Sequence, residues 1–89
     1  MEEGVKRVGT ISEPHGNGGI VKIICEYDGE KIIKNAKEVF LLNEGKRLGP
    51  FEVWSFRKHR RGQHLLKLNG FKTRGEVEKF SRFALAVHG

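Results

Sequence analysis

The sequence predicts an all-β fold, a small antiparallel barrel with one short helix before its last strand. Short apolar or alternating segments recur along the 89 residues, and most have the length of a strand rather than of a helix. Reversals that contain glycine separate these segments. One segment close to the C-terminal end has helical spacing instead. These observations indicate a single small domain over residues 1–89, with a modest hydrophobic core.

The first predicted hairpin begins with a strand over residues 5–13. Pro14 is expected to close this strand, because proline has no backbone N–H to donate to a neighbouring strand. The reversal that follows is expected to use positive φ angles at its glycines: Gly16, Gly18 and Gly19. A second strand is expected over residues 19–27, and its alternation predicts one apolar face: Val21, Ile23, Cys25 and Tyr27.

The middle of the chain is expected to hold a loop and one strongly buried strand. Residues 30–37, which follow a turn signal at Asp28-Gly29, read as a polar connection. Residues 39–42 are wholly apolar, which indicates a strand buried on both faces. A further reversal is expected over residues 43–46.

A second hairpin is predicted after Gly49-Pro50, which marks the entry to a strand over residues 51–58. Both faces of this strand carry large apolar side chains, as suits a barrel wall that lies against another element. Gly62 is placed to adopt positive φ in the turn. The return strand covers residues 63–68, and its alternation places two side chains on the face opposite to Leu66: Leu65 and Lys67.

The last part of the chain predicts a short helix and a closing strand. Thr73 and Glu76 have the spacing of a capping box, in which a hydroxyl group begins the helix and a carboxylate follows three residues later. Gly75 lowers the helix propensity, so the helix is expected to be short. Residues 84–88 are expected to form the closing strand.

The charge balance favours an acidic partner. Lys and Arg number 17 and Asp and Glu number 11, which gives a net charge of +6. On so small a domain this favours nucleic acid as a partner, although a generally soluble basic protein has the same balance. Cys25 is the single cysteine and is interpreted as a small buried hydrophobe. The absence of a disulfide framework, a signal peptide and an apolar run of membrane length predicts a cytoplasmic protein with no membrane contact.

The densest basic run is expected at the tip of the second hairpin: Arg57, Lys58, His59, Arg60 and Arg61. A protruding tip can place guanidinium groups on phosphates, with weak sequence selectivity and strong salt dependence. The same run fits a solvated turn that keeps a sheet edge soluble. Lys22 is a further candidate for this basic surface. Trp54 and Phe56, just before the tip, are interpreted as core residues rather than as platforms for RNA bases.

His15-Gly16 is interpreted as a turn or a surface contact rather than as a catalytic element. No nucleophile and base stand in a recognisable arrangement, so the sequence predicts a protein that is not an enzyme. The glycine-rich reversal leads into a strand and lacks the helix N-terminus that phosphate-binding loops use. No metal site and no cofactor are expected, because the histidines and the cysteine lack zinc-ligand spacing: His15, Cys25, His59, His64 and His88.

The opening stretch resembles that of the RimM family, bacterial factors that mature the small ribosomal subunit. Members begin with a Val-Gly strand, a His-Gly pair and then a Gly followed by a strand, which stand here as Val8-Gly9, His15-Gly16 and residues 19–23. The downstream order is also similar: an apolar run, a strand that leads into a basic hairpin, a Leu-Leu-Lys-Leu strand, a short helix and a Leu-x-Val strand. The resemblance covers roughly residues 5–88.

The resemblance implies a barrel of about six strands in the style of elongation-factor domain two. It also implies a non-catalytic assembly factor that binds the precursor small subunit near its head, with 16S rRNA and a head ribosomal protein as partners. The two contacts would be His15-Gly16 and the basic tip. Members of the family usually carry a second, smaller barrel, which is expected to be absent from this chain. A general RNA-binding barrel and a protein–protein adaptor are the alternatives, and a monomer is expected.

Overall fold

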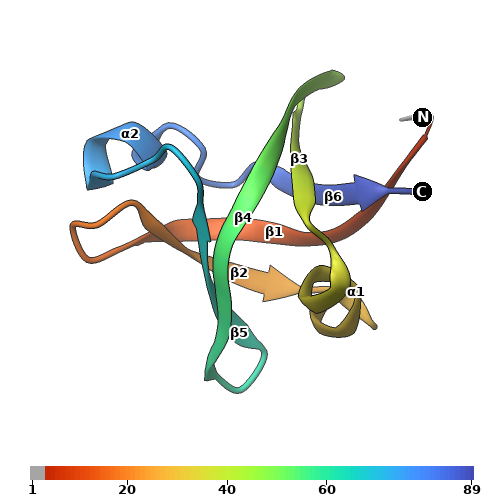
Figure 1. Ribbon diagram of the computed structural model, residues 1–89, viewed down its shortest axis with the longest axis horizontal. Helices are drawn as coiled ribbons and strands as arrows, with labels where there is room; N and C mark the ends of the chain where they lie inside the picture. The colour runs from red at the N-terminus through yellow and green to blue at the C-terminus, as the bar shows by residue number, and fades with distance from the viewer. Residues whose placement is uncertain (1–3) are drawn as a thin grey trace.

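The structure is a closed ring of six antiparallel strands with two short helices (Figure 1). The computed structural model describes residues 4–89. The strands are β1 (Val5–His15), β2 (Ile20–Cys25), β3 (Glu38–Asn43), β4 (Lys46–Arg60), β5 (Gln63–Leu68) and β6 (Ala84–His88). The helices are α1 (Gly29–Asn35) and α2 (Arg74–Glu78). The predicted fold class, an all-β antiparallel barrel with a short helix before the last strand, is confirmed.

The strands follow one another around the barrel in the order β1, β2, β5, β4, β3 and β6, and β6 pairs with β1 to close it. Each neighbouring pair is antiparallel. Strand β5 therefore lies between β2 and β4, and its side chains alternate between the inside of the barrel and the outer surface. This position makes β5 the centre of the outer surface described below.

The core consists of inward-facing side chains from all six strands. Val21, Leu66 and Phe56 occupy one register row across β2, β5 and β4, and all three belong to this core. The largest fully buried side chains are Ile11, Ile23, Ile33, Leu41, Leu66 and Leu85. Strand β3 is buried on both faces, as predicted, because Phe40 and Leu42 form a second cluster with Ala86 on the opposite face from the core.

Helix α1 corrects the prediction of a polar connection over residues 30–37. The helix has only seven residues, too few for its spacing to stand out in the sequence. Tertiary contacts stabilise it instead, since Ile33 is fully buried and Ile32 packs against the core. Gly29 begins the helix against β1, where a methyl group would collide with the carbonyl oxygen of Val8.

The first hairpin differs from its predicted bounds. Strand β1 continues through Pro14 to His15, because a register shift between Ile11 and Pro14 accommodates the proline opposite Val21. Positive φ angles occur at Gly16 and Gly19, as predicted; Gly18 is not among the residues with positive φ.

Strand β2 is shorter than predicted, since it begins at Ile20 and ends at Cys25. Tyr27 lies beyond its end with a positive φ of 37°. The side chain of Tyr27 is fully exposed, so it does not continue the apolar face of Val21 and Ile23.

Strand β4 also differs from its prediction. It begins at Lys46 and runs through Gly49-Pro50 rather than starting after that pair. A register shift between Val53 and Ser55 changes the phase of the alternation, so that Phe56 packs against the core. Trp54 lies within this shift and is 67% exposed, which makes the interpretation of Trp54 as a core residue wrong.

Several local predictions are confirmed. The reversal predicted over residues 43–46 joins β3 to β4, and Gly62 has the predicted positive φ in the turn that ends β4. Thr73 accepts a hydrogen bond from the N–H of Glu76, and the Glu76 carboxylate accepts one from the N–H of Thr73, which forms the capping box that begins α2. Within residues 4–89, neither helix has the length and apolar character needed to span a bilayer.

The two helical glycines give a matched test of this packing. Gly29→Ala is expected to destabilise the fold by about 1–3 kcal/mol, because the added methyl group would force α1 away from β1. Gly75→Ala is expected to stabilise the fold by about 0.5–1 kcal/mol, since its nearest neighbour, Thr73 Oγ1, lies 4.0 Å from the added carbon. Urea unfolding of the two variants measures both changes. A stabilised Gly29→Ala variant would contradict the close approach of α1 to β1.

Candidate nucleic-acid interface

A basic surface covers the outside of β2, β5 and β4. Residues opposite each other in neighbouring strands share a face, so the row Lys22, Leu65 and Arg57 points away from the core row of Leu66. Leu65 is only 3% exposed although it points outward and lies outside both core clusters. The two basic side chains thus stand on either side of a covered apolar residue.

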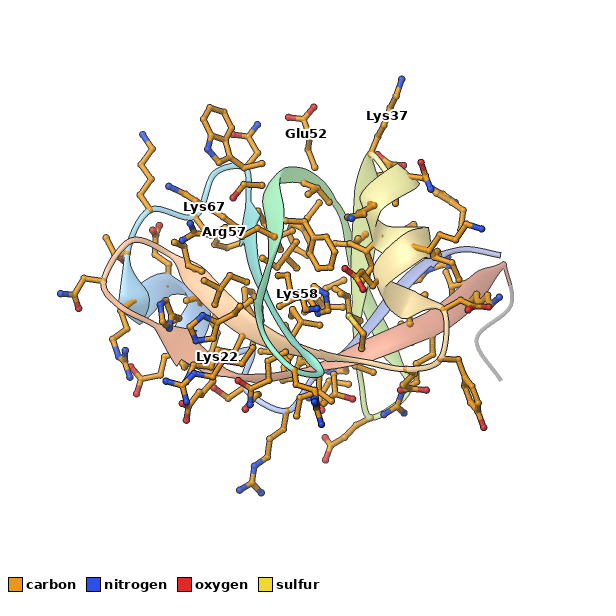
Figure 2. All side chains as sticks on the ribbon, turned by 90° about the horizontal axis from the view of Figure 1, so that it is seen from below. Lys22, Lys37, Glu52, Arg57, Lys58 and Lys67 are labelled. Atoms are coloured by element: carbon orange, nitrogen blue, oxygen red, sulfur yellow. The ribbon has the colours of Figure 1, made fainter. Side chains whose placement is uncertain are left out.

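The neighbouring outward rows extend this surface in both directions. Lys67 lies opposite Ile20 and Ser55, and Arg60 lies opposite Gln63. Figure 2 shows Lys67 and Arg57 close together, with Lys22 on the same side of the barrel. We call the following set the basic face: Lys22, Arg57, His59, Arg60 and Lys67, with His15 at its edge.

The two candidate segments of the sequence meet on the basic face. The imidazole rings of His15 and His59 lie in an edge-to-face arrangement with their centroids 4.9 Å apart. His59 reaches this position because it falls in a register shift of β4 between Lys58 and Arg60. His15 ends β1, and strands β2 and β5 separate it from β4 in the ring. The contact therefore depends on closure of this part of the barrel.

The pKa of His59 is lowered by its position on the basic face. Desolvation is the largest cause that lowers the pKa of His59 below its ordinary value of 6.5. Four positive or potentially positive neighbours lower it further: His15, Arg60, Lys22 and Arg57. The neutral imidazole is thus favoured, and a bound anion would favour the protonated form instead.

Two acidic groups moderate the local charge. The Nζ of Lys22 lies 3.1 Å from a carboxylate oxygen of Glu13, which comes from the bulged part of β1. The Glu13 side chain is 59% exposed, so solvent weakens the attraction between Glu13 and Lys22. The second group, Glu30, lies near Lys58 on the other side of the sheet.

The basic run of the sequence divides between two faces. Lys58 lies opposite His64 in the inward row, and Figure 2 shows it near the middle of the view, apart from Lys22 and Lys67. Its positive charge helps to lower the pKa of Glu30, behind the larger effects of His64 and Lys34. Arg61 is exposed in the turn itself. Thus Arg57, His59 and Arg60 share the basic face, whereas Lys58 does not.

The turn after His15 is fixed by contacts with the first residue of α2 and with the segment before that helix. The Arg74 side chain donates a hydrogen bond to the carbonyl oxygen of Gly16, with 3.2 Å between the atoms. Its backbone N–H donates to the carbonyl of Asn17. Gly19 combines a positive φ of 83° with a close approach to the backbone of Phe71 that leaves no room for a side chain. His15 is therefore presented from an anchored turn rather than from a free loop.

On the other side of the sheet, the buried His64 lies between Cys25 and Glu30, an arrangement that no spacing in the sequence indicates. Nδ1 of His64 is 3.4 Å from Sγ of Cys25, and Nε2 is 3.1 Å from a carboxylate oxygen of Glu30. The second contact is close but poorly aligned with the ring, because Nε2 has no well-directed hydrogen bond. His64 also stacks on Phe56, with ring centroids 5.0 Å apart.

This arrangement is better suited to packing than to nucleophilic chemistry. Burial, followed by the charge of Glu30, raises the pKa of the Cys25 thiol to about 11. A nucleophilic cysteine needs its thiolate near neutral pH, and this environment opposes it. His64 instead connects β5 with β2 and with α1. Among residues 4–89, no group of three or more His, Cys, Asp and Glu side chains is arranged to hold a metal ion.

The basic face includes residues that the sequence analysis did not select. Lys67 belongs to it because it alternates with the buried Leu66 and Leu68, and Leu65 points to the same side of β5; this alternation is visible in the sequence. Their approach to Lys22 depends on the pairing of β2 with β5, which joins segments about forty residues apart. No local sequence pattern predicts the pairing of β2 with β5.

Comparison with known proteins gives a family match and solved structures with a similar fold. The model of the RimM N-terminal domain matches residues 6–88. A crystal structure of a protein from Pseudomonas aeruginosa, described as the 16S ribosomal RNA processing protein RimM, superposes with a TM-score of 0.80 at 20% sequence identity. The match covers 93% of this chain and 49% of that one, so this chain spans about half the length of the Pseudomonas protein. No curated protein sequence matches the chain.

The pKa of His59 provides a test of the face in the free protein. We expect an NMR titration of His59 to show a midpoint below 6.5, and His15→Gln to raise it, because that change removes a neighbouring imidazole. The folded state then holds this proton less readily than the unfolded chain does. The His59 contribution therefore lowers stability as the pH falls below about 6.5 and has no effect well above it. A midpoint at or above 6.5 would contradict the crowded basic environment.

Proposed function

The chain belongs to the RimM family, whose N-terminal domain it matches over residues 6–88, and from this premise we propose that it is a non-catalytic ribosome-assembly domain. It binds the precursor of the small ribosomal subunit near its head and assists the maturation of 16S rRNA. The observation that carries the proposal is the basic face, in which cationic groups from β2, β4 and β5 share one surface. The description of the Pseudomonas protein as a 16S ribosomal RNA processing protein agrees with this role.

The chemistry of the basic face suits an RNA backbone. Arg57 and Arg60 can each contact a phosphate through two N–H groups, whereas Lys22 and Lys67 act as point charges. The apolar Leu65 lies between Lys22 and Arg57 and is itself almost fully buried. Phosphate contacts of this kind position a nucleic acid but carry little sequence information. Selectivity for immature particles then has to come from RNA shape or from a neighbouring ribosomal protein.

His59 adds a pH-dependent component to this binding. A phosphate placed beside its ring favours the protonated form, which opposes the lowered pKa of His59 in the free protein. Binding and protonation therefore support each other. Affinity for RNA is expected to increase as the pH falls below 6.5, whereas the His59 contribution to the stability of the free protein decreases over the same range.

The proposed mechanism is a shift in an RNA folding equilibrium. A closed barrel and an anchored His15 turn provide a rigid surface, so that binding is strongest for one arrangement of the RNA. If the mature-like arrangement binds more tightly than the alternatives, binding shifts the equilibrium toward it by at most the ratio of the two affinities. No covalent step is needed. The proposed partners are 16S rRNA and a head ribosomal protein, contacted by a monomer of this chain in the cytoplasm.

Charge reversal at the hairpin tip tests the proposed contact. Arg60→Glu combined with Arg61→Glu is expected to weaken binding to immature small subunits at low salt and to reduce the slope of log K against log salt by about 2. The matched control is Lys31→Glu with Lys46→Glu, which changes the net charge equally at exposed positions outside the basic face. Co-sedimentation at several salt concentrations measures both variants. Equal affinities of the two variants would contradict an interface on the basic face.

Co-sedimentation with immature and with mature small ribosomal subunits tests the assembly role. The unaltered chain is expected to sediment with immature small subunits and less with mature ones at physiological salt. Equal, salt-sensitive binding to both would indicate general RNA binding instead. Binding without salt dependence would indicate an adaptor that contacts protein. Failure to bind either particle would contradict recognition by this domain.

A further inference from the structure

Trp54 is an exposed aromatic residue that the basic face does not include. It is the single tryptophan of the chain and is 67% exposed. The register shift between Val53 and Ser55 turns it outward, next to the row that contains Lys67. A tryptophan normally gains stability by burying its large apolar surface, so this degree of exposure at the centre of a long strand calls for a role outside the core.

The surroundings of Trp54 are two shallow hollows that carry lysines. One hollow, of about 100 Å³, is bordered by Trp54 together with Lys67, Phe71 and Lys72. The other, of about 380 Å³, lies between α1 and β4 and is bordered by Trp54 together with Lys34 and Lys37. Trp54 thus borders both hollows, and two lysines border each of them.

Three carboxylates lie near these four lysines. Glu52 borders the larger hollow, Glu30 lies 4.0 Å from Nζ of Lys34, and Glu76 interacts with Lys72. Figure 2 shows Glu52 and Lys37 projecting from the barrel on the same side. One oxygen of Glu52 already accepts a hydrogen bond from the Asn69 side chain, with 2.8 Å between the atoms. The four lysines around Trp54 therefore outnumber the three carboxylates, and Lys67 and Lys37 are the two that the contacts with Glu30 and Glu76 do not involve.

We propose that Trp54 is a stacking platform for one unpaired base of a single-stranded RNA segment whose phosphates contact Lys67 and Lys37 on its two sides. This inference rests on the proposed function, because it names the form of RNA that the domain takes. An indole ring stacks on any base through its flat face, and alternating aromatic and cationic groups are the usual surface for single strands. The adjacent Ser55 lies opposite Lys67, which joins this platform to the basic face.

The chemistry favours a single strand over the other occupants. In a duplex the bases are already stacked on each other, so only phosphates can reach Trp54, and the indole gains nothing. An apolar peptide would bury Trp54 but would leave the flanking ammonium groups desolvated without partners. A single strand satisfies the ring and the charges together.

Tryptophan fluorescence tests the platform directly, because the chain has one tryptophan. The probes are a single-stranded RNA of about ten nucleotides, the same strand paired with its complement, and inorganic polyphosphate. We expect the single strand to quench the fluorescence, and the duplex and polyphosphate to bind through the basic face with little quenching. Quenching by the duplex or polyphosphate to the same extent would overturn the stacking.

Variants separate this inference from the proposed function. Trp54→Ala is expected to weaken binding of the single strand about 10-fold and to leave duplex binding unchanged, whereas Trp54→Phe retains most of the affinity. The matched control is Tyr27→Asn, which removes a fully exposed aromatic ring that borders neither hollow and keeps a residue that tolerates positive φ. Binding anisotropy with a labelled strand measures all of them.

The outcomes are distinguishable. If RNA binds with full salt dependence but Trp54→Ala has no effect, the platform is wrong and the proposed function stands. If Trp54 fluorescence responds to assembled subunits but to no free RNA, its occupant is a ribosomal protein and the inference is also overturned. If no RNA and no subunit binds, both the inference and the proposed function fail.

Discussion

Closure of the barrel by the pairing of β1 with β6 is the constraint on which the rest of the structure depends. Once the ring is closed, each strand residue faces either the packed interior or the outer surface, with register shifts as the exceptions. The interior takes the aliphatic side chains, including Leu66 and Ile23. The outer side of β2, β5 and β4 then collects the cationic side chains from segments that are distant in the sequence.

Register shifts decide which side chains become available for contact. In β4, one shift turns Trp54 outward and allows Phe56 to pack inward, and a second places His59 where it meets His15. In β1, a third accommodates Pro14 within the strand. Bulges of this kind cost regular pairing but redirect side chains, and they are frequent near functional sites. His59 in the basic face, and Trp54 beside it, occupy such positions.

The sequence predicts best what local chemistry determines. The buried run of β3, the return strand β5, the turn at Gly62 and the capping box at Thr73 each have a local physical cause, and the structure confirms them. Helix α1 was missed because contacts with the barrel, rather than its own seven residues, stabilise it. The exposure of Trp54 and the contact of His15 with His59 were missed because both depend on register, which is a property of strand pairs. The charge density of residues 57–61 predicts the basic tip. Only the strand register shows that Lys58 faces away from Arg57 and Arg60.

Photo-crosslinking to immature small subunits tests the central claim most directly. A photoreactive side chain would replace Ser55, which is exposed beside Lys67 on the outer side of β4, or Leu48, which lies 37% exposed in the other half of the same strand. The account predicts that the probe at position 55 forms crosslinks with 16S rRNA and that the probe at position 48 does not. Crosslinks to RNA from position 48 alone, or none from either position in a bound complex, would contradict an RNA interface on the basic face.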